Sequence, residues 1–186
     1  MNRSWMGTVS GRKFAPFDPH VDDIDIRDIA RGLAMTCRYG GQVKRFYSVA
    51  EHCYHVSYLV PEKYALHGLL HDSAEAYIGD MIRPIKHAPQ MHEFRRAEGL
   101  IEEAVAERFG LKWDYDATVA VKEMDDRILI NEIRELSYMP DAYLSEHPLN
   151  TREPVDRTLY FCSPRGAEAC FLIRFEELTG LNVTPL

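Results

Sequence analysis

Apolar residues recur every three to four positions through most of the chain, which is the spacing that buries one face of an α-helix. This pattern predicts about six helices. The first is expected to begin at residues 22–25 and to end at 36–40, and the others to span 48–61, 61–79, 91–109, 118–138 and 163–179. Together they predict an all-α helical bundle that forms a single domain over residues 1–186.

Two segments outside the helices carry a different pattern. Residues 6–17 are predicted to form a small β-hairpin, in which Thr8-Val9 and Lys13-Phe14 flank a turn. The proline-containing stretch 139–162 is expected to be a long connection with a short strand at 159–161.

Capping residues mark where two of these helices begin. Ser48 and Glu51 form a capping-box pattern, in which the hydroxyl and the carboxylate each accept a backbone N–H hydrogen bond at the start of the helix. Ser163 and Pro164 combine an N-cap residue with a first-turn proline.

The charge balance limits the classes of partner. The chain has 22 Lys and Arg against 29 Asp and Glu, a formal net charge of −7, which argues against a general nucleic-acid-binding protein. No apolar run approaches the roughly 20 residues that cross a bilayer, and no signal-peptide pattern begins the chain. We therefore expect a cytoplasmic protein without a membrane partner, whose four cysteines are reduced.

The segment 64–80 concentrates the candidate chemistry. It opens with apolar residues and then places His71, Asp72, Glu75 and Asp80 within a short span. On a continuous helix, His71 and Glu75 share one face and Asp72 lies beside them. Charged groups gathered on a buried helix need a partner that neutralises them, and imidazole with carboxylate suits a divalent metal such as Mn, Fe, Co, Ni or Zn.

A wider motif surrounds this pair of residues. Its members follow one another at fixed spacing: His71-Asp72-x-x-Glu75, then Gly79-Asp80, then Pro84-Ile85-Lys86. This order resembles that of HD-domain metal-dependent phosphohydrolases, and most of all that of the small bacterial and phage hydrolases of deoxynucleotides. The resemblance covers about residues 25–132.

The resemblance implies four metal ligands. His71 and Asp72 are two of them, and the family places a further histidine early in the preceding helix, which matches His52 in Ser-Val-Ala-Glu-His. His55, one turn further on, is the rival for this role. The fourth ligand is implied to be Asp125, on a later helix.

Other polar residues near these positions are expected to lie outside the ligand set. Glu132 is the later acid that the family pattern places after Asp125. Asp126 and Glu123 are expected to be solvated surface charges. His67 is expected to pack or to support the site rather than to bind metal.

The family chemistry is the attack of metal-bound water on phosphorus, because the metal lowers the pKa of its water toward about 7. Glu75 is then implied to orient or deprotonate this water. Asp80 is implied to contact the sugar or to take part in catalysis.

Substrate contacts are implied at four further positions. Arg38 and Tyr39 resemble the Arg-Trp pair by which related deoxynucleotidases hold phosphate and sense the absence of a 2′-hydroxyl, with tyrosine here in place of tryptophan. Arg83 and Lys86 are implied to bind phosphate through forked hydrogen bonds and a point charge, respectively.

The expected function is therefore a dNTP triphosphohydrolase of the dATP type, with one transition metal in the site and Mg²⁺ on the substrate phosphates. A 5′-deoxynucleotidase that acts on monophosphates is the alternative, and hydrolysis of guanosine tetraphosphate or of cyclic dinucleotides ranks lower. A non-catalytic nucleotide sensor on the same scaffold stays open. The family forms dimers or larger rings, so we expect a homo-oligomer, either a dimer or a hexamer, whose partner is a small-molecule deoxynucleotide.

Overall fold

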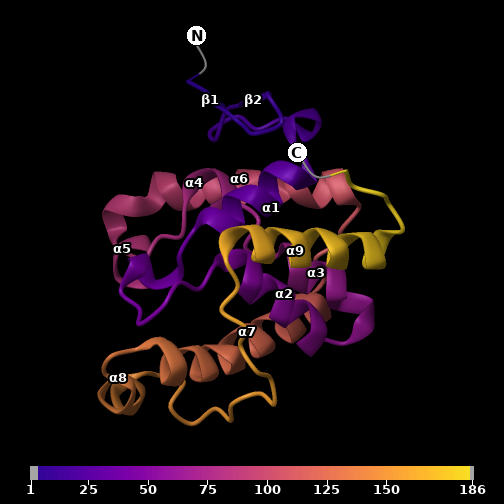
Figure 1. The fold of residues 1–186 in the computed structure, drawn as a ribbon. Coiled ribbons are helices and arrows are strands. Elements are labelled where there is room, and N and C mark those ends of the chain that lie inside the picture. The colour runs from indigo at the N-terminus through magenta and orange to yellow at the C-terminus, as the bar shows by residue number, and fades with distance from the viewer. Residues whose placement is uncertain (1–3, 185–186) are drawn as a thin grey trace.

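The computed structural model describes residues 4–184 and confirms an all-α architecture with a small N-terminal hairpin (Figure 1). The strands are β1 (Met6–Gly7) and β2 (Lys13–Phe14). The helices, in chain order, are α1 (Ile26–Met35), α2 (Val49–Leu59), α3 (Ala65–Leu70), α4 (Glu75–Ile78), α5 (Arg83–Lys86), α6 (His92–Phe109), α7 (Tyr115–Leu136), α8 (Pro140–Glu146) and α9 (Pro164–Thr179). Short 3₁₀ turns lie at Val21–Asp23, Arg38–Gly41, Glu62–Tyr64 and Pro89–Met91.

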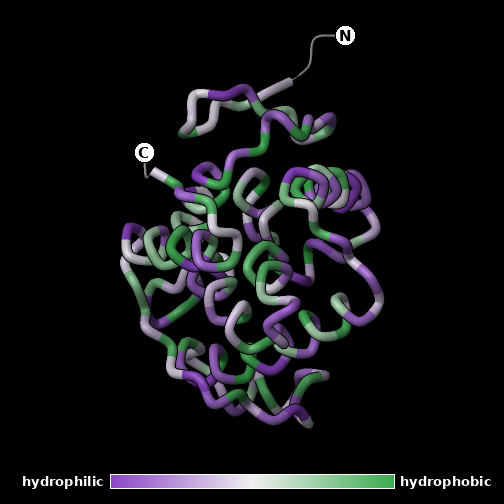
Figure 2. The backbone as a smooth tube through the Cα atoms, turned by 90° about the vertical axis from the view of Figure 1, so that its right-hand side faces the viewer, coloured by the Kyte–Doolittle hydropathy of each residue, from purple (hydrophilic) through white to green (hydrophobic). Residues whose placement is uncertain are grey.

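Helix α2 lies at the centre of the fold, where it packs against α1, α3, α7 and α9 (Figure 1). One buried apolar cluster includes Ile29, Leu69 and Phe171, and a second includes Val56 and Ile128. Hydrophobic and hydrophilic residues alternate along the helical turns, as expected of amphipathic helices (Figure 2). Because α2 contributes to both clusters, Glu51, His52 and His55 on this helix are deeply buried.

The N-terminal hairpin stands at one end of the bundle (Figures 1 and 2). Its strands pair antiparallel, with Met6 opposite Phe14. The first strand was predicted at residues 8–9. It lies just before them, at residues 6–7, because the turn is longer than expected. The backbone N–H and the hydroxyl of Ser10 both donate to the buried carboxylate of Asp28 on α1, each at 2.7 Å, and this contact fixes the turn against the bundle.

The long helices begin and end at capping residues. Helices α1, α7 and α9 start after Asp25, Asp114 and Ser163, whose side-chain oxygens each accept a backbone N–H from the first turn. Helix α7 therefore begins three residues before the predicted position 118. Gly110 and Gly180 end α6 and α9 in the left-handed conformation, as their positions predict.

The predicted continuous helix over 61–79 is wrong, because the chain is interrupted between α3 and α4. Residues 71–74 form turns with hydrogen bonds to carbonyls three residues back instead of four. His71 Nδ1 donates to the carbonyl oxygen of Gly68 at 2.8 Å, which is the acceptor that the N–H of Asp72 would use in an α-helix. The metal-motif histidine thus competes for a helix hydrogen bond at the point where the chain turns.

The capping box at the start of α2 is only half formed. Ser48 Oγ accepts the N–H of Glu51, as predicted. The Glu51 carboxylate is directed elsewhere and accepts the backbone N–H groups of residues 160–162, at 2.7–2.8 Å. The strand predicted at 159–161 is therefore wrong: this segment has irregular backbone that wraps around a buried carboxylate, with Phe161 at a φ of 56°.

Two short helices occupy stretches that were predicted as loops. Helix α5 lies in the segment 80–89, and α8 lies in the segment 139–162 and packs against α7. Both contain a proline in the first turn, where its missing N–H is tolerated. Within residues 4–184, no helix is long and apolar enough to cross a membrane.

Candidate metal centre and adjoining pocket

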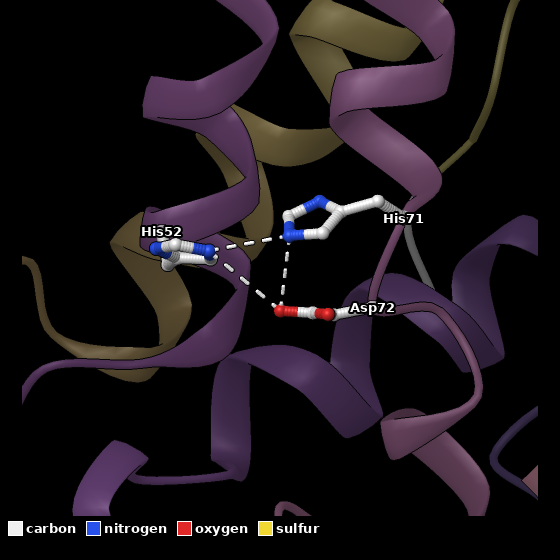
Figure 3. Close-up of side chains that lie close together, drawn as sticks. All are labelled: His52, His71 and Asp72. Carbon is white, nitrogen blue, oxygen red and sulfur yellow. Dashed lines mark hydrogen bonds and ion pairs between the residues drawn. The ribbon is translucent and has the colours of Figure 1, made fainter. Parts of the chain in front are cut away.

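Three side chains converge inside the bundle: His52 from α2, and His71 and Asp72 from the turn after α3 (Figure 3). His52 Nε2 lies 3.3 Å from His71 Nε2 and 3.7 Å from Asp72 Oδ2. His71 Nε2 lies 3.2 Å from Asp72 Oδ2. Two nitrogens and one oxygen therefore face a common point.

The other ring nitrogen of each histidine is held by an acceptor. His52 Nδ1 donates to Glu132 Oε1 at 2.6 Å, and His71 Nδ1 donates to the Gly68 carbonyl oxygen. Because these acceptors hold the proton on Nδ1, each neutral ring presents an unprotonated Nε2 to the common point. Acceptors in this position orient metal-binding histidines and raise their basicity.

A further donor comes from α7. Asp125 Oδ1 lies 3.3 Å from His52 Nε2, while Lys122 Nζ lies 3.0 Å from Asp125 Oδ2. One carboxylate oxygen thus faces the cluster and the other is neutralised by lysine. Asp125 and Glu132 are seven residues apart on α7, so they share a helix face and reach the same imidazole ring from its two nitrogens.

The distances and the donor types suit a metal ion. A tetrahedral ion with bonds of about 2.0–2.1 Å separates its donor atoms by about 3.3–3.4 Å. The separations of 3.2–3.7 Å within this cluster lie near that value. Two unprotonated imidazole nitrogens do not attract each other, whereas a shared cation attracts both. The group formed by His52, His71 and Asp72 could therefore hold a metal ion.

Burial and mutual attraction set the charges in the cluster. Burial alone would raise the pKa of Asp72. The charge and hydrogen bond of His71 lower this pKa below its ordinary value. The pKa of Asp125 is likewise lowered by His52 despite burial. Burial alone would lower the pKa of His71, but Asp72 and Cys53 raise it well above its ordinary value. Without a cation the histidines take up protons, which a metal would displace.

A buried network supports the cluster. Glu132 also accepts from Arg38 Nε at 3.2 Å and from the Tyr39 hydroxyl at 2.7 Å. Burial would raise the pKa of Glu132, but Arg38 and His52 lower it to about 2. Arg38 Nη1 lies 3.5 Å from Asp72 Oδ2, so one guanidinium bridges two carboxylates. Tyr39 has a φ of 60°, a conformation that non-glycine residues seldom adopt outside functional sites and turns.

Glu75 is the first residue of α4, and its carboxyl group is buried beside the motif. The side chain is 8% exposed, and Oε2 has no hydrogen-bond partner within residues 4–184. Burial, together with the charges of Asp72 and Asp80, raises the pKa of Glu75 well above its ordinary value. A buried carboxyl oxygen without a partner is typical of a group that exchanges protons at a functional site.

A pocket of about 500 Å³ is connected to the cluster through Arg38, which lines the pocket and contacts Asp72, whereas His52, His71, Asp72 and Asp125 are not among its lining residues. Arg38, Tyr39, Asp80 and Arg83 all line it, so the structure brings together four of the residues that were expected to act on the substrate. Lys86 is directed elsewhere, with its Nζ 2.6 Å from Glu98 Oε1 on α6. A second cavity, of about 550 Å³, reaches His71 and Asp125 from the side of α6.

The rival histidines face other partners. Arg157 Nε donates to His55 Nδ1 at 2.9 Å, and His55 Nε2 lies 3.5 Å from Glu51 Oε1, so His55 faces Arg157 and Glu51. His67 Nε2 donates to the carbonyl oxygen of Lys112 at 3.1 Å. His67 therefore packs against the segment after α6, as expected.

The expectation that Asp126 is a solvated charge is wrong. Asp126 is buried, and Lys122 Nζ lies 2.5 Å from its Oδ1. Arg83 and Arg152 approach the same carboxylate at 3.9 and 3.7 Å. Asp126 therefore links α7 to two other segments through cations, whereas Glu123 is exposed, as predicted.

Two parts of the site are not evident from the motif. Glu132 holds His52, Arg38 and Tyr39 together, and its spacing of seven residues from Asp125 was the signal for this role. Tyr143 of α8 and its neighbours Tyr138, Met139 and His147 line the pocket, and aromatic residues in an otherwise polar connection were the signal there.

Comparison with known proteins places the chain among relatives of similar length. No protein-family model matches the sequence. The chain is 32% identical over 183 residues to the uncharacterized protein YfdR of Escherichia coli, an alignment that covers 96% of this chain and 98% of that protein. It is 40% identical over 120 residues to an uncharacterized protein of Rhodobacter capsulatus, which covers 60% of this chain and 61% of that protein.

Proposed function

The chain belongs to the family of the Escherichia coli protein YfdR, and we propose that it is a divalent-metal-dependent phosphohydrolase of deoxynucleotides. One observation carries the proposal: His52, His71 and Asp72 direct three donor atoms to one point, and Arg38, which contacts Asp72, lines a pocket together with Arg83. A metal site next to fixed cations suits phosphoryl transfer, because both neutralise charge on phosphate oxygens. The resemblance of the motif to HD-domain hydrolases supports the same chemistry.

The proposed ligands are His52, His71, Asp72 and Asp125, and the proposed metal is one of Co, Mn, Zn, Fe or Ni. This mixture of imidazole and carboxylate suits borderline first-row ions. When bound, the metal supplies a Lewis acid and lowers the pKa of water toward about 7. Glu132 positions a ligand, because its hydrogen bond to Nδ1 keeps His52 in the tautomer that presents Nε2.

Glu75 is the proposed general base. Its unpartnered Oε2 and its raised pKa make it a better proton acceptor than an ordinary carboxylate. In the proposed step, Glu75 accepts a proton from water as the water oxygen bonds to phosphorus. The bond from phosphorus to O5′ of the deoxynucleoside breaks, and the leaving O5′ receives the proton that Glu75 took from the water.

Arg38 and Arg83 are the proposed phosphate contacts. Arg38 is held between Asp72 and Glu132, which fixes its guanidinium before the substrate arrives. Arg83 has a half-exposed side chain that can turn toward the pocket. Lys86 is paired with Glu98, so the geometry supports the two arginines more than this lysine as phosphate contacts.

The proposed substrate is a deoxynucleoside triphosphate of the dATP type, carried with Mg²⁺, and a deoxynucleoside monophosphate is the alternative. Both reactions break the same P–O5′ bond. The triphosphate substrate releases triphosphate and the monophosphate releases orthophosphate, so the identity of the phosphate product distinguishes them. Tyr39 and Asp80 line the pocket and are the proposed contacts to deoxyribose. The second cavity is lined by Glu102 and Glu103 and suits a phosphate less well.

Product analysis tests the proposal. The chain is loaded in turn with Mn, Co or Zn, supplied with Mg²⁺, and incubated with dNTPs, dNMPs and NTPs, and the products are identified by phosphorus NMR. We expect triphosphate from dATP. Orthophosphate from monophosphates alone would identify a 5′-deoxynucleotidase, and metal-dependent nucleotide binding without any product would overturn hydrolysis in favour of a sensor.

A matched pair of variants on α7 controls this experiment. Asp125→Asn is expected to abolish product formation, because it weakens a metal ligand. Glu123→Gln, two residues away and exposed, is expected to retain the full rate.

A further inference from the structure

The pocket lined by Arg38 has two chemically different kinds of lining residue. Arg38, Asp80 and Arg83 bring charged groups to it. The end of α7 and the segment that includes α8 contribute aromatic or apolar side chains: Tyr138, Met139, Tyr143 and His147. A ligand that fills the pocket therefore meets both charged and apolar surface.

Two of these side chains form a parallel ring pair. The ring centroids of Tyr143 and His147 lie 5.4 Å apart, and the ring planes differ by 18°. Tyr143 lies on α8, and His147 is the residue that directly follows the helix. A parallel pair of rings leaves an outer face onto which a third planar ring can stack.

The side chains around this pair are open to solvent. Tyr138 is 75% exposed, Met139 66% and Tyr143 46%. Within the described part of the chain, none of the three belongs to either buried apolar cluster. Large apolar side chains gathered at the wall of a pocket indicate a ligand that covers them.

We infer that the wall formed by residues 138–147 receives a nucleobase, which stacks on the ring pair of Tyr143 and His147. The inference rests on the proposed function in one respect, because Arg38 and Arg83 are taken to hold the phosphate. With phosphate at these arginines, the group joined to it through the sugar lies in the same pocket as Tyr143 and His147. A volume of about 500 Å³ is ample for a nucleotide.

This wall defines the substrate class. Inorganic polyphosphate and sugar phosphates carry no planar ring and leave the wall uncovered, so the substrate is a nucleoside phosphate. Stacking depends on ring area more than on the hydrogen-bonding edge of the base. The wall therefore favours purines over pyrimidines and discriminates weakly between adenine and guanine.

Equilibrium binding tests the inference. Affinities are measured in Glu75→Gln protein loaded with Mn, so that ligand is not consumed, for dATP and for 2-deoxyribose 5-triphosphate, which lacks a base. Adding Tyr143→Ala is expected to weaken dATP binding about tenfold and to leave binding of the abasic compound unchanged. Tyr143→Phe keeps the ring and is expected to bind dATP like the parent.

A matched control uses another tyrosine. Tyr115→Ala, at the start of α7 and 81% exposed, is expected to change neither affinity. Unchanged dATP affinity in Tyr143→Ala, or an equal loss for the abasic compound, would overturn the nucleobase wall.

Failure of the inference and failure of the proposed function give different results. Wild-type protein that binds dATP through Tyr143 but releases no phosphate product would overturn the hydrolase and leave the wall supported. If the wild-type protein hydrolyses dATP but the Glu75→Gln protein binds the abasic compound as tightly as dATP, the nucleobase wall alone would be overturned.

Discussion

His52 Nδ1 and Glu132 Oε1 form a 2.6 Å hydrogen bond between two fully buried side chains that are 80 residues apart in the chain. The bond joins α2 to α7 at the candidate metal centre. It leaves His52 Nε2 free to face His71 and Asp72, and it places the Glu132 carboxylate where Arg38 also reaches it. One buried acid thus orients a ligand and fixes a cation.

Removing the charge of Glu132 is expected to weaken metal binding. Glu132→Gln lowers the basicity of His52 and leaves Arg38 with less compensation, so metal affinity should fall about 10–100-fold. Metal titration of the purified variant measures this loss. Glu135→Gln, exposed on the same helix, should bind metal like the wild type. Equal affinities in the two variants would refute the orienting role of Glu132.

Replacing Glu75 is expected to separate catalysis from metal binding. Glu75→Gln removes the proposed proton acceptor without removing a metal ligand, so the rate should fall about 10²–10⁴-fold. Metal content, measured by elemental analysis, should remain that of the wild type. A variant that keeps a near-full rate would show that Glu75 is not the general base.

The Glu51 carboxylate is expected to stabilise the fold in a pH-dependent manner. Burial would raise its pKa, but His55 and the N–H groups of residues 160–162 lower it below its ordinary value. Because the unfolded chain then binds the proton more readily, this stabilisation is complete above the unfolded pKa of about 4.3 and is lost as pH falls toward the native pKa.

Urea denaturation measures the contribution of Glu51. Glu51→Gln should lower the free energy of unfolding by about 2 kcal/mol at pH 7, and the difference from wild type should shrink at pH 3. Glu123→Gln serves as the exposed control. A difference that is the same at both pH values would rule out an ionic basis.

Two identical substitutions should have opposite effects on stability. A Cβ on Gly32 would lie 2.4 Å from the carbonyl oxygen of Ala76, so Gly32→Ala must push α1 away from α4, at a cost of about 1–3 kcal/mol. A Cβ on Gly99 meets nothing within 4 Å, so Gly99→Ala should stabilise α6 by about 0.5–1 kcal/mol. Thermal unfolding measures both, and a Gly32→Ala protein as stable as wild type would contradict the close packing of α1 on α4.

Features with local causes were predictable from the sequence. Ser48, Ser163 and Gly110 act on backbone groups within a few residues, so helix ends followed from pattern alone. The resemblance of the motif to HD-domain hydrolases implied that His52 joins His71 and Asp72, and the structure brings these three side chains together.

Features with distant partners were not predictable in this way. The Glu51 carboxylate bonds to a backbone N–H that lies 109 residues away, where a local pattern predicts a capping box. Asp126 is buried, and arginines from two other segments approach its carboxylate. Its position in a run of charged residues therefore wrongly predicted a solvated side chain. The helix interruption after Leu70 coincides with a side-chain hydrogen bond of His71, which apolar spacing does not reveal.

Reconstitution with metal tests the central claim most directly. Chelator-treated protein is incubated with dATP, and Mn is added back in steps while triphosphate release is followed. We expect no release from the metal-free protein and a rise that reaches its plateau at one metal per chain. Equal release in the presence of chelator, or silence at every metal concentration with every nucleotide tested, would contradict a metal-dependent phosphohydrolase.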